Sequence, residues 1–379
     1  MKKIICMLCA VTFLFQTAAA VSAESAGPTV SAKSAILMEA STGEILYESN
    51  PDERLPIASV TKIMTMLLIM EAIDSGKITL DEMVTASERA KSMGGSTMFL
   101  ETGEQLTVSD MLKGIAVASA NDGAVAMAEH IAGSEEGFVA MMNQRAKELG
   151  MENTNFVNTN GLDDDNHYSS ARDVALMSRE LIKHPKIFEY TTIWTDSLRD
   201  GKFALANTNK LIRFYQGANG LKTGSTSKAM CCLSATAERN GMQLIAVVLG
   251  SPTSKERFAS ASALLDYGFA NYAVHGGITA GEEAGRIPVE KGTEAEVAAV
   301  AKDDCSVLVG KGQQDSVEKT VELEETLTAP VKAGQTVGTV KLTLEGETLA
   351  ETELVAQTDV PKMPFGTMLL NILKRWLKG

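Results

Sequence analysis

The chain has 379 residues, of which 45% are hydrophobic and 22% are charged, a composition typical of globular proteins and not of disordered or fibrous ones. Its formal net charge is −13 at pH 7. Phosphate binding needs a basic face that this charge balance does not supply, so nucleic acid is excluded as a partner. The four histidines form no ligand pair such as H-E-x-x-H, so the sequence predicts no metal site and no cofactor.

The first 23 residues are typical of a secretory signal peptide. Lys2 and Lys3 precede an apolar run from Ile4 to Phe15, and small residues lead to an A-x-A-like cleavage site at residues 21–23. The run is too short for a retained membrane span, which needs roughly 20 apolar residues. We therefore expect an exported protein at the extracytoplasmic face of the bacterial cell membrane.

Three cysteines follow the signal peptide: Cys231, Cys232 and Cys305. Their number is odd and their spacing is neither of the zinc type nor C-x-x-C, so no disulfide framework is predicted. Adjacent residues of a strand point to opposite faces of a sheet, so we expect at least one of Cys231 and Cys232 to be a core residue.

The elements between residues 34 and 272 predict an α+β fold. Two β-rich runs around a turn at 34–48 indicate a hairpin, and 230–250 indicates two strands joined at Asn240-Gly241. Helical patterns are expected at 60–75, 108–132, 135–149, 170–183 and 254–272. Strands at both ends with helices between them favour an antiparallel sheet covered by a helical cluster.

The composition changes near residue 276. Residues 276–358 are rich in Val, Thr, Glu and Gly in alternating stretches without a helical period, which predicts a separate small all-β domain. In residues 359–379, apolar side chains fall at helical spacing with cations near the end. We expect an amphipathic helix that anchors the protein at the cytoplasmic membrane surface. The alternative is a terminal helix packed on the β domain.

A serine and a lysine open the first long apolar helix. Ser59 lies in its first turn and Lys62 follows three residues later on the same face. Near apolar walls the pKa of a lysine falls, and a neutral amine can accept the proton of a serine hydroxyl. The helix N-terminus favours a developing oxyanion at the same place. A serine N-cap followed by a surface lysine is the ordinary alternative.

Two further triplets argue against that alternative. Ser119-Ala120-Asn121 interrupts an apolar pattern with two hydrogen-bonding side chains, and Lys222-Thr223-Gly224 opens a predicted strand. The glycine would let a substrate approach the strand, while Lys222 and Thr223 can bind a carboxylate. S-x-x-K, S-D-N and K-T-G together are the signature of class A β-lactamases and penicillin-binding proteins. Order and chemistry agree, although the second triplet is S-A-N.

The sequence resembles the low-molecular-mass penicillin-binding proteins of the D-alanyl-D-alanine carboxypeptidase type, serine peptidases that trim peptidoglycan stem peptides. The stretches that carry the resemblance include "GGSTMFLETGEQLTVSDMLKGIAVASANDGAVAMAEHI", "NTNGLDDDNHYSSARDVALMSREL" and "ANGLKTGSTSKA". It covers nearly the whole chain. It implies a β-lactamase/transpeptidase-like catalytic domain at 24–275, the β-rich domain at 276–358 and the surface anchor at 359–379. The implied partners are peptidoglycan pentapeptides ending in D-Ala-D-Ala, with β-lactam antibiotics as inhibitors.

The resemblance also implies roles for the first two motifs. Ser59 is the acylated nucleophile that attacks the penultimate D-alanine, and Lys62 is the base for that step. Ser119 relays protons to the leaving amine, and Asn121 contacts the substrate amide. Lys62 is the better candidate for the base because it is near Ser59, while the electric field of Lys222 could contribute to the proton transfer.

The third motif is implied to bind the substrate. Lys222 and Thr223 would hold its terminal carboxylate, with Gly224 as the position of close approach. Arg257 lies where the family often has a carboxylate-binding arginine, although an exposed helical arginine is the ordinary explanation. The oxyanion hole is implied to use the backbone N–H of Ser59 and of a residue just after the triplet, Ser225 or Thr226.

Three other functions are compatible with the triplets or with the fold that they imply. A serine β-lactamase needs a glutamate for deacylation, and the glutamates between the second and third triplets look like helix-surface or cap residues. A D,D-endopeptidase shares the triplets, but the length and the tail favour the carboxypeptidase. An inactive wall-binding module would keep the fold without turnover, yet all six catalytic-type residues are present. No G-x-S-x-G elbow supports a Ser-His-Asp site, and His167 is expected to be a loop or structural residue.

Overall fold

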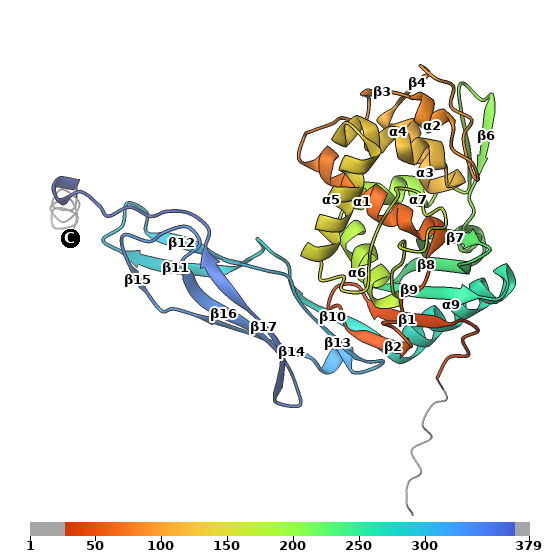
Figure 1. The fold of residues 1–379 in the computed structure, drawn as a ribbon. Helices are drawn as coiled ribbons and strands as arrows, with labels where there is room; N and C mark the ends of the chain where they lie inside the picture. Colours follow the sequence, from red (N-terminus) through yellow and green to blue (C-terminus); the bar gives the residue numbers. More distant parts are fainter. Residues whose placement is uncertain (1–26, 368–379) are drawn as a thin grey trace, which may run out of the picture.

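The computed structural model describes residues 27–367, which form two units (Figure 1). The first combines a sheet with helices, and the second is built from strands. The expected signal peptide at 1–23 and residues 368–379 of the expected surface helix lie outside the described residues. Residues 359–364 of that expected helix are not helical: Val360 pairs with Val331 and Lys362 with Gly292, so the second unit extends past the expected boundary at 358. Within residues 27–367, no helix is both long enough and apolar enough to span a membrane.

The first unit contains nine strands and nine α-helices in the described part of the chain. Its strands are β1 (Ser34–Glu39), β2 (Ile45–Ser49), β3 (Met83–Thr85), β4 (Gln105–Thr107), β5 (Thr195–Leu198), β6 (Phe203–Ala206), β7 (Ala218–Thr226), β8 (Met230–Arg239) and β9 (Met242–Ser251). Its helices are α1 (Lys62–Asp74), α2 (Glu88–Lys91), α3 (Val108–Ala118), α4 (Asn121–Ala132), α5 (Glu135–Glu148), α6 (Ala171–Leu181), α7 (Phe188–Thr191), α8 (Leu211–Phe214) and α9 (Ser254–Asn271), with 3₁₀ turns η1 (Ala58–Thr61) and η2 (Pro185–Ile187).

Five of these strands form an antiparallel sheet in the order β2-β1-β9-β8-β7. Because side chains alternate along a strand, Leu37 and Leu244 face α9, while Ile36 and Ile245 face the opposite helical layer. Both faces are therefore covered by helices, as Figure 1 shows. The predicted α+β class, the hairpin at 34–48 and the turn at Asn240-Gly241 are confirmed.

Helix α1 is the centre of that helical layer. Ten of its 13 residues are buried, so it has almost no solvent face. The surrounding helices begin at polar caps: Thr107, Ser134, Ser170 and Thr253 each accept a hydrogen bond from the backbone N–H three residues later.

The single helix expected at 108–132 is wrong in one respect. The chain forms two helices, α3 and α4, separated at Ser119, whose φ of 63° is left-handed. The backbone N–H of Ala120 donates to Gly114 O at 3.1 Å and closes the end of α3. Apolar residues continue on both sides of the break, so the periodicity does not reveal it.

The second unit is all-β. Its elements are β10 (Tyr272–Ile278), β11 (Glu283–Glu290), β12 (Glu296–Ala301), β13 (Cys305–Gly310), η3 (Gln314–Ser316), β14 (Glu318–Leu323), β15 (Leu327–Thr328), β16 (Thr336–Leu344) and β17 (Glu347–Ala356). Six strands form a sheet in the order β14-β16-β17-β12-β11-β15, and β10 pairs with β13. A separate apolar core fills this unit.

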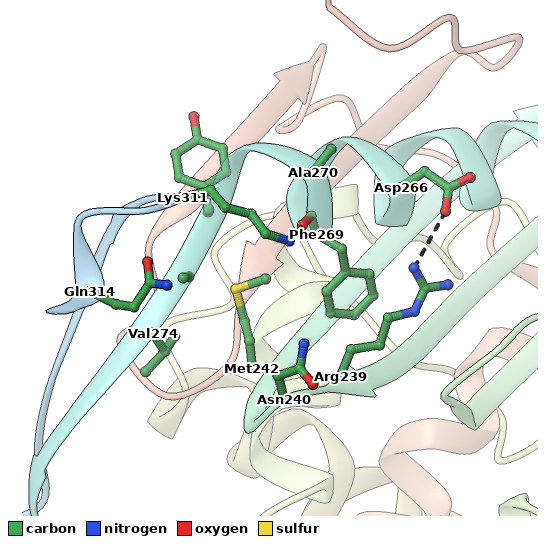
Figure 2. Close-up of a pocket in the computed structure, with 11 residues that line it drawn as sticks. Arg239, Asn240, Met242, Asp266, Phe269, Ala270, Val274, Lys311 and Gln314 are labelled. Atoms are coloured by element: carbon green, nitrogen blue, oxygen red, sulfur yellow. Dashed lines mark hydrogen bonds and ion pairs between the residues drawn. The ribbon is translucent and has the colours of Figure 1, made fainter.

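The two units meet where α9 passes directly into β10. A cavity of about 370 Å³ lies at this junction. Figure 2 shows the residues that line it, among them Arg239, Asp266 and Lys311. The Lys311 ammonium donates to Phe269 O at 2.6 Å, and the Arg239 guanidinium lies 4.5 Å from the Phe269 ring centroid. Lys311 and Arg239, the two cations that line the cavity, therefore already have partners within the protein. No residue of the three triplets lines this cavity.

Candidate active site

The nucleophile candidate lies where the chain enters the buried helix. Ser59 is half-buried in η1, and Lys62 begins α1 one turn later. The backbone just before Ser59 is strained, because Ala58 has a positive φ of 48°. Lys62 Nζ lies 3.0 Å from Ser59 Oγ, so the predicted neighbourhood of these two side chains exists in the structure.

Lys62 is fully buried and makes three close polar contacts. Besides Ser59 Oγ, its Nζ lies 2.6 Å from Asn121 Oδ1 and 2.7 Å from Asn160 O. Burial lowers the pKa of Lys62 well below its ordinary value, and the charge of Lys222 lowers it further, against the opposing effect of Asp122. A neutral amine has two N–H donors and one lone pair. Two carbonyl acceptors then take the two donors, and the lone pair faces the Ser59 hydroxyl.

The second triplet approaches from the α3–α4 break. Asn121 is the first residue of α4, and its Nδ2 donates to Gly94 O at 2.7 Å while its backbone N–H donates to Ser96 O at 2.7 Å. The orientation of the side-chain amide is therefore fixed, because Nδ2 donates to Gly94 O and Oδ1 accepts from Lys62 Nζ. Ser119 lies two residues earlier at the left-handed position and is buried. Residues 94–96 border the site through these two hydrogen bonds.

Asp122, the next residue of α4, holds the neighbouring loop through hydrogen bonds to backbone N–H groups. Its carboxylate accepts hydrogen bonds from the backbone N–H groups of Met98, Leu100 and Gly123, at 2.9 to 3.1 Å. It thereby ties the loop after residue 96 to the start of α4. No motif in the sequence analysis pointed to this residue.

The third triplet lies in the middle of β7, and not at its opening as expected. Gly224 packs against the nucleophile turn: a Cβ at this position would lie 2.7 Å from Ile57 O and 2.9 Å from Ser59 N. Only a residue without a side chain permits this approach. Thr223 Oγ1 donates to Thr208 Oγ1 at 2.7 Å, an interaction that the sequence did not reveal.

Lys222 is the second buried lysine of the site. Its exposed fraction is 1%, and its Nζ donates to Thr223 O at 3.0 Å. Burial lowers the pKa of Lys222 to about 7, with a smaller contribution from the charge of Arg257. An anion bound beside Lys222 would favour its charged form, so this lysine suits the binding of a carboxylate.

Arg257 is buried, so the alternative of an exposed helical arginine is wrong. Its Nη1 donates to Gly224 O at 3.2 Å and to Cys232 O at 3.3 Å, which joins α9 to β7 and β8. Its Nε, also buried, has no hydrogen-bond partner. The guanidinium therefore lies against the backbone of the third triplet.

The structure thus brings the three triplets together around Ser59. Besides Asp122, the sequence does not reveal two further neighbours, the Asn160 carbonyl that contacts Lys62 and the Thr208 hydroxyl that contacts Thr223. A backbone carbonyl carries no residue-type signal, so Asn160 could not have been found from composition or spacing. Within residues 27–367, no group of His, Cys, Asp and Glu side chains could hold a metal ion.

Two family models match the chain. Residues 19–253 match the D-alanyl-D-alanine carboxypeptidase model of peptidase family S11, and residues 277–362 match the C-terminal domain of penicillin-binding protein 5. Among curated relatives, D-alanyl-D-alanine carboxypeptidase DacF of Bacillus subtilis is 47% identical over 92% of this chain and 90% of its own length. The DacA enzyme of Haemophilus influenzae is 37% identical over 97% of this chain and 96% of its own length.

Solved structures agree with this similarity. Penicillin-binding protein 5 of Haemophilus influenzae superposes with a TM-score of 0.74 at 37% identity, covering 89% of this chain and 99% of its own. A penicillin-binding protein of Listeria monocytogenes, solved with ampicillin bound, superposes with a TM-score of 0.58 at 36% identity. That match covers 63% of this chain and 98% of the other.

Proposed function

This chain belongs to the D-alanyl-D-alanine carboxypeptidase family of serine peptidases, and we propose that it removes the terminal D-alanine of peptidoglycan stem peptides through an acyl-enzyme on Ser59. The observation that carries the proposal is the contact between Ser59 Oγ and the fully buried Lys62 Nζ at 3.0 Å. Such a pair provides a nucleophile and its base without histidine.

Acylation begins with proton transfer from Ser59 to Lys62. The Lys62 amine, whose neutral form is favoured because burial lowers its pKa, accepts the hydroxyl proton as Ser59 Oγ attacks the carbonyl carbon of the penultimate D-alanine. The new oxyanion is held by the backbone N–H of Ser59 and of Ser225 or Thr226. Lys62 is preferred to Lys222 as the base because the described contact of Lys222 Nζ is with Thr223 O.

The leaving D-alanine must receive a proton as the C–N bond breaks. We assign its relay to the Ser119 hydroxyl, which lies two residues before the Asn121 amide that contacts Lys62. The proton taken from Ser59 then passes from Lys62 through Ser119 to the departing amine, and free D-alanine leaves. Water completes the cycle by attacking the ester of Ser59, with Lys62 again as the base.

The terminal carboxylate of the substrate is assigned to the third triplet. Lys222 supplies the cation. The Thr223 hydroxyl, which donates to Thr208 Oγ1 in the described structure, would turn its O–H toward the carboxylate. Arg257 adds positive charge behind Gly224, where its Nη1 donates to Gly224 O and its Nη2 donates to Ser254 Oγ. The site thereby recognises a free carboxyl end, which is what a carboxypeptidase requires.

β-Lactams are proposed as inhibitors. They would acylate Ser59 through the same steps, but ring opening leaves the departing amine attached to the acyl group. Rapid deacylation by a β-lactamase needs a glutamate that activates water. Glu135, which the sequence analysis took for a surface or cap residue, is largely buried but pairs with Arg89 at 2.9 Å and accepts from Thr159 at 3.3 Å. Its carboxylate is therefore already engaged, which favours slow deacylation.

Mass spectrometry after incubation with benzylpenicillin tests the catalytic proposal, with wild type compared with Ser59→Ala. A stable adduct on the Ser59 peptide, absent from the variant, together with D-alanine release from a D-Ala-D-Ala peptide, supports it. Rapid penicillin turnover would instead indicate a β-lactamase. Cleavage of cross-links in place of terminal D-alanine would indicate an endopeptidase, and a protein without any adduct would be a binding module.

We also propose export, cleavage after residue 23 and attachment to the extracytoplasmic membrane surface through the part of the expected 359–379 helix that follows residue 364. The support is the sequence: a signal-peptide pattern at the start and apolar residues at helical spacing, with cations, at the end. Co-sedimentation with anionic lipid vesicles tests the attachment. Because Val360 is buried in the second unit and pairs with Val331, the truncated chain ends at residue 364. The full mature chain should bind and the truncated chain should not; equal binding of both would refute the attachment.

A further inference from the structure

One buried titratable side chain touches the nucleophile turn but has no part in the mechanism above. His167 has an exposed fraction of 3%, and its Nε2 lies 2.7 Å from Thr61 Oγ1. Thr61 is fully buried and lies between Ser59 and Lys62 in the chain. The contact joins residues 106 positions apart, so it is made by the tertiary fold and not by the local turn.

The direction of this hydrogen bond follows from the other ring nitrogen. The backbone N–H of Val157 donates to His167 Nδ1 at 3.2 Å, so Nδ1 carries no proton. In a neutral imidazole the proton is then on Nε2, which donates to Thr61 Oγ1. Burial lowers the pKa of His167 to about 4, opposed by the nearby Asp163 and Asp164 and assisted by Lys62, so the ring is neutral at ordinary pH.

The segment that carries His167 reaches the site at several other points. We call residues 159–167 the strap, since they connect the nucleophile turn with the end of β7. On one side Asn160 O accepts from Lys62, and a Cβ on Gly161 would lie 1.9 Å from Ala58 O. On the other side Thr226 Oγ1 donates to Asp163 Oδ1 at 2.7 Å. The strap thus lies between the two elements that supply the implied oxyanion hole.

We propose that His167 is a positioning residue for acylation: by donating to Thr61 it fixes the turn that presents Ser59 to Lys62. This inference rests on the proposed function, because it concerns the same acylation step. His167 does not contact the reacting atoms in the described structure; it acts through Thr61. Ser59 Oγ needs the alignment, because it lies within hydrogen-bonding distance of Lys62 Nζ at 3.0 Å and a misplacement of about 1 Å can cost about a hundredfold in rate.

Two conservative variants separate this role from general support of the fold. His167→Gln retains an N–H donor near the position of Nε2, whereas His167→Asn retains an acceptor near Nδ1 and loses the donor to Thr61. Both remove the ring that packs edge-on against Phe156, so they lose the same aromatic contact. They therefore lose the same ring contact and exchange hydrogen bonds: the Gln variant keeps the one to Thr61 and the Asn variant keeps the one from Val157. The Asn variant is also smaller by one methylene, and the melting temperature measures the cost of that difference in stability.

The measurement is the second-order rate constant for acylation by labelled benzylpenicillin, with the melting temperature of each variant as a parallel readout. We expect His167→Asn to lower the rate constant at least about tenfold and His167→Gln to stay within about threefold of wild type. The KM for a D-Ala-D-Ala peptide should change little while kcat falls, because the contact positions the nucleophile and not the carboxylate site. Thr61→Val combined with His167→Asn should cost no more than either alone.

Equal rate losses in the Asn and Gln variants, in proportion to their loss of thermal stability, would overturn the positioning role. Additive losses in the double variant would do the same. A wild type that forms no penicillin adduct would overturn the proposed function, and this inference with it. A wild type that reacts while His167→Asn reacts equally fast would overturn the inference alone.

Discussion

Replacement of Lys222 by methionine should change how the stability of the protein depends on pH. The pKa of Lys222 is about 7 in the folded protein against an ordinary value of 10.5. Between these two values the unfolded chain holds a proton that the folded chain has lost, so the free energy of unfolding rises with pH in this window. The slope is at most about 1.4 kcal/mol per pH unit, which amounts to about 4–5 kcal/mol across the window.

Methionine keeps most of the aliphatic stem and removes the titrating amine. The Lys222→Met variant should therefore lack this slope, and below about pH 7 the two proteins should show parallel pH dependence. Lys62 is present in both proteins, but its pKa is lowered by the Lys222 charge, so a part of its own titration will differ between them. This effect of Lys62 reduces the expected difference between the two pH profiles. From pH 7 to pH 9, wild type should gain about 2 kcal/mol more unfolding free energy than the variant.

Urea unfolding at pH 7, 8 and 9 measures this difference. Fluorescence of Trp194, measured with Trp376 replaced by phenylalanine in both proteins, follows the first unit, in which Lys222 lies. The m-values check that both proteins unfold with the same exposed surface. Wild type should gain stability over the variant as pH rises. A stability difference that stays constant from pH 7 to 9 would show that Lys222 keeps its proton in the folded state, and the reasoning about its burial would be refuted.

Three further substitutions test the site. Lys62→Met should lower the rate of penicillin acylation by about 10²–10⁴ through loss of the base, and acylation at the wild-type rate would point to another base. Gly224→Ala places a Cβ 2.9 Å from Ser59 N, so we expect at least about tenfold lower kcat/KM in a D-alanine release assay. Unchanged kinetics would show that the turn at Ser59 can move to accept the methyl group without loss of activity. Asp122→Asn weakens the acceptor of three backbone N–H groups and should cost about 1–3 kcal/mol in urea unfolding, which an unchanged midpoint would contradict.

Local patterns predicted much of the fold. The turn at Asn240-Gly241 and the helices near 135–149 and 254–272 depend on residues close in sequence, and their signals are read directly from it. The break at Ser119 does not have such a signal. Ser119 has a left-handed backbone conformation between α3 and α4, while apolar residues continue at helical spacing on both sides of it.

The site was predictable where side-chain chemistry repeats a known motif. The sequence placed Ser59 and Lys62 one helical turn apart, and the structure has them in contact. The contribution of Asn160 is a backbone carbonyl, and that of His167 is a contact across 106 positions. Neither leaves a mark in residue type or spacing, because both depend on how a loop between two helices is folded over a third.

Strand β7 lies at the end of its sheet, and within residues 27–367 β8 is the one strand hydrogen-bonded to it there. Part of this edge is already covered, because Asn219 O and Gly220 O accept from Thr191 and Asn209. Along the remainder, an extended peptide can add to the sheet as another strand. Substrate would then be held partly through its main chain, which is common to all stem peptides. The same edge is a place where two protein molecules can pair. An acylated enzyme, with this edge covered by its ligand, should therefore associate with itself less readily than the free enzyme.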